Sequence, residues 1–177
     1  MPYPFAIVKF LAREYSRLSN RLRLLTELVE KDADKRIIAV VLFGSIARLT
    51  ASPSSDTDLL VLMETSGNRA LERELSHHFY RLLTSAETAN GEDGSLWHIV
   101  LVTGNATGDD LDADFLSQVG QDGVLMYQRS GSTLPVVLQN MASFADWQER
   151  AQLLATVLSR TLDLYNKEYQ QSIGKAS

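Results

Sequence analysis

The feature that most constrains the fold is a run of seven apolar residues, Ile37 to Phe43, in a chain of 177 residues. A short run rich in valine and isoleucine, without a polar residue, is typical of a β-strand that is covered on both faces. Such a strand requires a sheet with another layer on each side. Further short apolar runs predict strands at residues 59–63, 96–102 and 123–127.

Two long stretches that lack proline and glycine flank this strand-rich region. In residues 5–33 and again in residues 144–165, apolar side chains recur alternately three and four residues apart, which predicts two long helices with narrow apolar seams. Helices with matching seams could pack on each other within one chain, or could form a homodimer by pairing with a second copy. The seam residues are Val8, Leu11, Tyr15, Leu18, Leu22, Leu25 and Val29, then Phe144, Trp147, Ala151, Leu154, Leu158, Thr161 and Tyr165.

Shorter helical patterns at residues 69–83 and 110–119 lie between the predicted strands, and residues 84–95 are expected to form a loop. This order of elements predicts an α/β or α+β fold, a mixed sheet with helices, extended by long N- and C-terminal helices. We expect an N-terminal long helix over residues 1–34, a core domain over 35–130 and a C-terminal helical extension over 131–177.

Composition excludes several classes of protein. The chain has no cysteine, so it contains no disulfide framework, thiolate metal site or cysteine nucleophile. No stretch approaches the ~20 apolar residues that a membrane span requires, and we expect a soluble, cytoplasmic protein. A net charge of −5 and the lack of any nucleic-acid-binding motif argue against nucleic acid as a partner.

The first third of the chain is nevertheless basic, because residues 1–50 carry nine Lys or Arg against five Asp or Glu. Arg13, Arg17 and Arg21 recur every four residues and therefore share one side of the predicted helix. A solvated helix face is the simpler interpretation of these arginines. A surface for phosphate, RNA or a partner protein is the alternative.

The residues that indicate chemistry lie at the two ends of one loop. Gly44 and Ser45 follow the first buried strand, where a glycine lets the backbone approach a phosphate while amides and a hydroxyl donate to its oxygens. Asp56 and Asp58 open the next strand two residues apart, so their carboxylates share one face. Mg²⁺ prefers a few carboxylate oxygens together with substrate phosphates, which this arrangement would supply.

Gly-Ser, ten residues and Asp-x-Asp together resemble the signature of the minimal nucleotidyltransferases of the DNA polymerase beta superfamily. The resemblance extends from about residue 37 to residue 127. It implies transfer of a nucleoside monophosphate from a nucleoside triphosphate, expected to be ATP, to a hydroxyl of a protein or small molecule, with two magnesium ions bound and pyrophosphate leaving. It also implies that Gly44, Ser45 and Arg48 contact the phosphates and that Asp56 and Asp58 bind the metal.

Members of this family carry a third carboxylate on a later strand, whereas His98 occupies the best-matching position here. A neutral imidazole can act as a base or bind a metal, but it is a poorer magnesium ligand than a carboxylate. Glu92 and Asp93 could supply the missing carboxylate if their loop folds back.

Two hypotheses follow. The first is an active, magnesium-dependent nucleotidyltransferase, which is antitoxin-like in the sense that some minimal family members modify or bind a helical toxin. Its acceptor could then be a partner protein. The alternative is a catalytically degenerate protein of the same fold, which binds nucleotide or acts as an oligomerisation or regulatory scaffold.

Overall fold

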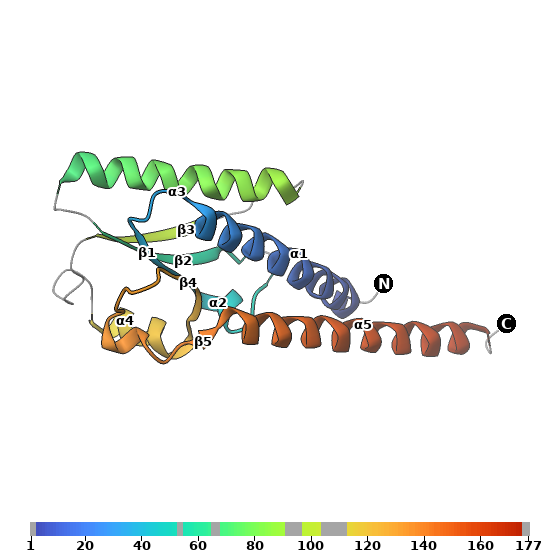
Figure 1. Cartoon of the computed structure of the whole chain (residues 1–177). Coiled ribbons are helices and arrows are strands. Elements are labelled where there is room, and N and C mark those ends of the chain that lie inside the picture. The colour runs from blue at the N-terminus through green and yellow to red at the C-terminus, as the bar shows by residue number, and fades with distance from the viewer. Residues whose placement is uncertain (1–2, 53–54, 65–67, 91–96, 104–112, 175–177) are drawn as a thin grey trace.

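A computed structural model describes residues 3–52, 55–64, 68–90, 97–103 and 113–174 of the chain (Figure 1). Helices and strands alternate through most of it, as the sequence predicts. The elements are α1 (Tyr3–Lys31), β1 (Ile37–Phe43), α2 (Gly44–Ala47), β2 (Thr57–Met63), α3 (Arg69–Asn90), β3 (Trp97–Thr103), α4 (Ala113–Asp122), β4 (Val124–Gln128), the 3-10 turn η1 (Val136–Leu138), β5 (Ala142–Ser143) and α5 (Phe144–Gly174).

The strands form one mixed sheet in the order β3-β2-β1-β4-β5. β1 lies at its centre and pairs antiparallel with both β2 and β4, while β2 pairs parallel with β3 and β4 pairs parallel with β5. The predicted bounds of the first strand are confirmed, and most of its side chains are buried. The expected fold class, a mixed sheet with helices and long terminal helices, is therefore confirmed.

Each face of the sheet is covered by a different set of helices, which explains why β1 has no polar face. Alternate side chains of β1 and β2 pack with α1, α3 and α5 on one face, and the remaining ones pack with α4 and η1 on the other. Leu59 and Val61 belong to the first layer, whereas Leu60 and Leu62 belong to the second. This alternation decides which face of the sheet each polar residue near the strand ends reaches.

The two long helices, α1 and α5, pack on each other within one chain. For the first part of α5, the seams therefore serve packing within the chain and not pairing with a second copy. Gln148 Nε2 donates a hydrogen bond to Ser19 Oγ at 3.3 Å across this contact. The seam of α5 is buried at Trp147 and Ala151, but it is exposed at Tyr165, where α5 extends past the rest of the molecule (Figure 1). The side chain of Val8 lies outside the described part of the chain.

The prediction of a loop from residue 84 is wrong as far as residue 90, because α3 continues to Asn90. Two causes keep these residues helical. Ala86 is fully buried against the core, and the hydroxyls of Thr84, Ser85 and Thr88 donate to carbonyls four residues earlier in the same helix. Residues 91–95 of the predicted loop lie outside the described residues. In the described ranges, every helix is too short or too polar to cross a lipid bilayer.

A matched pair of valine substitutions tests the layer assignment. Val61 is 0% exposed in β2, whereas Val136 is 79% exposed in η1 although its neighbours in sequence are apolar. We expect Val61→Ala to lower the free energy of unfolding by about 2 kcal/mol through lost burial and an unfilled cavity. Val136→Ala should change it by less than about 0.5 kcal/mol. Urea denaturation of both variants measures this, and equal effects would contradict the assigned layers.

Candidate nucleotide-binding site

The site begins with Gly44, which has a positive φ of 73°. A Cβ atom at this position would lie 2.1 Å from Asp58 Oδ2, a distance that no side chain can tolerate. The pairing of β1 with β2 produces this approach, because it sets Phe43 directly opposite Asp58. Glycine is therefore required at position 44 both by backbone conformation and by contact with the carboxylate.

Asp58 is joined to His98 on the other side of β2. The parallel register of β2 with β3 pairs the two residues, and His98 Nδ1 lies 2.9 Å from Asp58 Oδ1. Because an ionised carboxylate can only accept hydrogen bonds, Nδ1 is the donor in this contact, and Nε2 is an acceptor in the neutral form of the imidazole. The His98 side chain is 61% exposed and that of Asp58 is 21% exposed, so Nε2 is accessible from solvent.

The remaining residues predicted for the site are more loosely placed. Asp56 is exposed just before β2 starts, and Ser45 is half-buried in α2. Arg48 is exposed and points to α4, where its NH1 lies 3.6 Å from Asp122 Oδ2. Arg48 and Gly44 line a pocket between α2 and α4 with an aromatic wall. The other lining residues are Phe43, Phe115, Gln118, Val119 and Asp122.

Sequence analysis missed the role of α1, which holds the loop between Ser45 and Asp56 at its middle and at its end. The Tyr15 hydroxyl accepts a hydrogen bond of 3.2 Å from the Ala51 amide. Burial raises the pKa of Tyr15, and the hydrogen bond from Ala51 partly opposes that shift. Six residues along the helix, Arg21 donates to Thr57 Oγ1 at 3.1 Å and lies 4.7 Å above the Trp97 ring.

The other terminal helix holds the start of the same segment. Trp147 of α5 is fully buried and its indole N–H donates to the Ile46 carbonyl at 3.1 Å, one residue after Ser45. Phe144 stacks on this indole with ring centroids 5.8 Å apart. Both long helices therefore contact the motif directly. A signal was present in the sequence, because Tyr15 and Trp147 are aromatic seam residues with a polar group, and such residues find a hydrogen-bond partner when they are buried.

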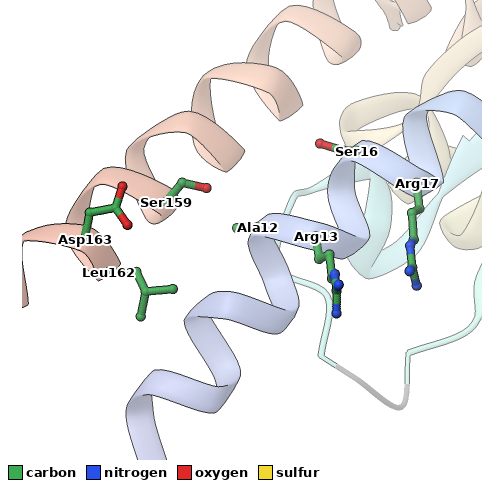
Figure 2. Close-up of a pocket in the computed structure, with 7 residues that line it drawn as sticks. All are labelled: Ala12, Arg13, Ser16, Arg17, Ser159, Leu162 and Asp163. Atoms are coloured by element: carbon green, nitrogen blue, oxygen red, sulfur yellow. The ribbon is translucent and has the colours of Figure 1, made fainter. Parts of the chain in front are cut away.

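The interpretation of the three arginines as a single surface is wrong for Arg21, which is only 5% exposed. Arg13 and Arg17 are exposed and point to the same side of α1 (Figure 2). Together with Ala12 and Ser16 they line a groove between α1 and α5. On the α5 side, the groove is lined by Ser159, Leu162 and Asp163.

Asp56 and Asp58 are the donors available to the implied metal. Carboxylate oxygens of Asp56 and Asp58 are ligands that magnesium prefers, and the missing Cβ of Gly44 leaves the backbone close to Asp58 Oδ2. Among the residues that the structure describes, no three His, Asp or Glu side chains form a metal-binding group. Two carboxylates beside a backbone that a phosphate can approach are a donor set that fits magnesium held in part by substrate phosphates. Glu92 and Asp93 lie outside the described residues.

Comparison with protein families agrees with this geometry. Residues 24–96 match the family model "Polymerase beta, Nucleotidyltransferase". The chain contains a nucleotidyltransferase-family domain. The resemblance predicted from the sequence is thereby confirmed, and the matched nucleotidyltransferase segment includes the elements that carry Gly44 and Asp58. The matched segment does not include the terminal-helix residues that hold the loop, which are Tyr15, Arg21 and Trp147. No curated protein sequence matches the chain.

Several solved structures match the chain distantly. A toxin–antitoxin complex with AMP-PNP is 16% identical over 89% of this chain and 98% of its own, with a TM-score of 0.37. A proposed nucleotidyltransferase from Sulfolobus solfataricus is 19% identical over 68% and 95%, with a TM-score of 0.36. A variant of the toxin–antitoxin pair MntA–HpeT is 16% identical over 84% and 91%, with a TM-score of 0.33. With TM-scores this low, the matches carry no argument about fold or function.

Two glycines with nearly the same backbone conformation test the contact at Asp58. Gly131 has a φ of 77° and would place a Cβ in open space, so Gly131→Ala should cost only the left-handed strain of about 1–2 kcal/mol. Gly44→Ala should cost more, because Asp58 must also move, and it should abolish magnesium-dependent nucleotide binding. Urea denaturation and calorimetric titration measure the two effects. Equal stability losses with binding retained would refute the proposed contact.

Tyr15→Phe tests whether α1 holds the loop. Removing the hydroxyl should lower the free energy of unfolding by about 1 kcal/mol, because the Ala51 amide loses its acceptor. The Ala51 amide should also exchange its hydrogen faster, by about fivefold to tenfold, in native-state exchange followed by NMR. Tyr80→Phe is the matched control, since Tyr80 is 47% exposed. Unchanged exchange at Ala51 would show that the loop is held by other contacts.

Proposed function

We propose that the protein transfers a nucleoside monophosphate from a nucleoside triphosphate, ATP in the first instance, to a hydroxyl group of a protein or small molecule. The observation that carries the proposal is the close approach of Gly44 to Asp58, since it sets a side-chain-free backbone beside a carboxylate. Phosphate-binding loops need such a backbone, and phosphoryl transfer needs positioning together with neutralised charge. The nucleotidyltransferase domain over residues 24–96 supports the same reaction class.

In this proposal Gly44 and Ser45 bind the triphosphate and Asp56 and Asp58 hold magnesium, with two ions expected from the family resemblance. Bound magnesium would neutralise phosphate charge and stabilise the attacking and leaving oxygens. Arg48 is available to a phosphate only if it leaves Asp122. The ion pair between Arg48 and Asp122 is exposed, so breaking it costs little free energy. The acceptor hydroxyl attacks the α-phosphorus. The bond between the α-phosphorus and the oxygen that bridges the α- and β-phosphates breaks, and pyrophosphate leaves.

His98 is the proposed general base. Its Nε2 accepts the proton of the attacking hydroxyl, while Nδ1–H stays hydrogen-bonded to Asp58 and the carboxylate stabilises the imidazolium that forms. A histidine oriented by a carboxylate is a recurrent arrangement for proton abstraction. His98 would thus supply the basic function of the carboxylate that family members have at this position.

The hydrogen bond between His98 and Asp58 also supports the alternative function, a catalytically degenerate scaffold. With His98 on Asp58 Oδ1, one oxygen of the carboxylate is engaged by an imidazole N–H, and this bond competes with a metal. A protein with such a site would bind nucleotide weakly or not at all.

Calorimetric titration with a non-hydrolysable ATP analogue tests whether the site binds its substrate. The wild-type chain should bind in the presence of magnesium and lose affinity in EDTA, and the double variant Asp56→Asn with Asp58→Asn should lose the magnesium dependence. Asp122→Asn is the matched control, because it removes a nearby exposed carboxylate and should leave binding intact or strengthen it by releasing Arg48. Absence of binding by the wild-type chain would favour the scaffold.

Substitutions of His98 separate an active base from a degenerate site. With pyrophosphate release from ATP as the readout, His98→Asn should lower turnover by about a hundredfold and leave nucleotide affinity nearly unchanged. His98→Asp should retain part of the turnover, because a carboxylate can also accept the proton. If the wild-type chain has no turnover and His98→Asp gains it, the histidine marks a site that has lost activity.

A further inference from the structure

α5 exposes a line of aliphatic side chains on the face that does not contact α1. Leu153 is 65% exposed, Val157 is 50% exposed and Leu164 is 62% exposed. Their spacing of four and seven residues places them on one side of the helix. Trp147, on the other side, is fully buried. We call Leu153, Val157 and Leu164, together with Arg160 between them, the outer stripe of α5.

A parallel helix pair would be unfavourable along the outer stripe. Arg160 occupies the position three residues after Val157 and four before Leu164. In a parallel homodimer each stripe residue faces its own copy, so two guanidinium groups would meet inside the seam. In an antiparallel pair with Leu153 opposite Leu164 of the partner subunit, Arg160 faces the partner's Val157, and its aliphatic stem can cover that side chain.

The charges beside the outer stripe match the antiparallel register. At 100° per residue, Glu149 and Lys167 lie along one flank of the stripe, and Arg150 and Glu168 lie along the other. In the described part of the chain, all four are exposed and none of them has an ion-pair partner. Setting Leu153 opposite the partner's Leu164 brings Glu149 beside the partner's Lys167 and Arg150 beside the partner's Glu168.

We propose that α5 pairs antiparallel with α5 of a second copy of this chain, about a two-fold axis between Leu158 and Ser159. The arrangement is self-complementary, since every contact made by one copy is repeated by the other, which a two-fold axis requires. It leaves the packing of α1 on α5 intact, because the outer stripe faces away from α1. It also covers the part of α5 that extends past the rest of the molecule (Figure 1).

Sedimentation equilibrium over a range of protein concentrations measures the association. The wild-type chain should be a reversible dimer. Lys167→Glu should weaken it by about tenfold or more, because two ion pairs per dimer become two like-charge contacts. Adding Glu149→Lys to Lys167→Glu should restore the wild-type affinity by exchanging the charges. Arg73→Glu, an equivalent reversal on exposed α3, should change nothing. A wild-type monomer at all concentrations would overturn the proposal and leave the outer stripe for a different protein.

Cysteine cross-linking tests the direction of pairing without background, because the chain has no cysteine of its own. The double variant Leu153→Cys with Leu164→Cys should form a covalent dimer under mild oxidation, and each single variant should stay monomeric on a non-reducing gel. Cross-linking by the single variants would indicate parallel pairing and contradict the proposed register, as would the absence of any cross-link. These variants leave Gly44, Asp58 and His98 unchanged, so the outcome does not depend on transferase activity.

Discussion

The antiparallel pairing of β1 with β2 is the interaction on which the remaining structure of the site depends. It forms the centre of the sheet and sets Phe43 opposite Asp58, so that the chain leaving β1 at Gly44 passes directly against the carboxylate. A slip of one residue in this register would turn Asp58 and Thr57 each to the opposite face of the sheet, and would remove Asp58 from its place beside Gly44. Such a slip would also move each side chain from one core layer to the other and disrupt the packing of both layers.

The terminal helices add a second constraint, which acts on the loop between the strands. A ten-residue connection is costly to order unless contacts hold it, since each ordered backbone residue costs about 1–2 kcal/mol of conformational entropy. Tyr15 binds the loop at Ala51, Arg21 binds Thr57 at its end, and Trp147 binds Ile46 at its start. Folding of both long helices onto the sheet therefore stabilises the arrangement of the motif. The three-part division of the chain stays a prediction from sequence, but the packing ties its parts to one site.

Sequence reasoning predicted the sheet, the long helices and the position of the motif, because these depend on local patterns of two, three and four residues. It also placed His98 beside the aspartates, since strand alternation and the family resemblance act together there. It missed the contacts of Arg21, because a four-residue spacing of arginines cannot distinguish an exposed stripe from one whose last member is buried. It ended the third helix too early, since hydroxyl side chains that favour loops can also bond within a helix.

The central claim is that the nucleotide lies where Gly44 meets Asp58. A crystal structure of the chain with a non-hydrolysable ATP analogue and magnesium tests it most directly. The account predicts phosphate oxygens against the Gly44 and Ser45 backbone, magnesium on Asp56 and Asp58, and His98 Nε2 facing the α-phosphorus from the acceptor side. A nucleotide bound elsewhere, or phosphates held away from Gly44 with Asp58 bonded only to His98, would contradict it.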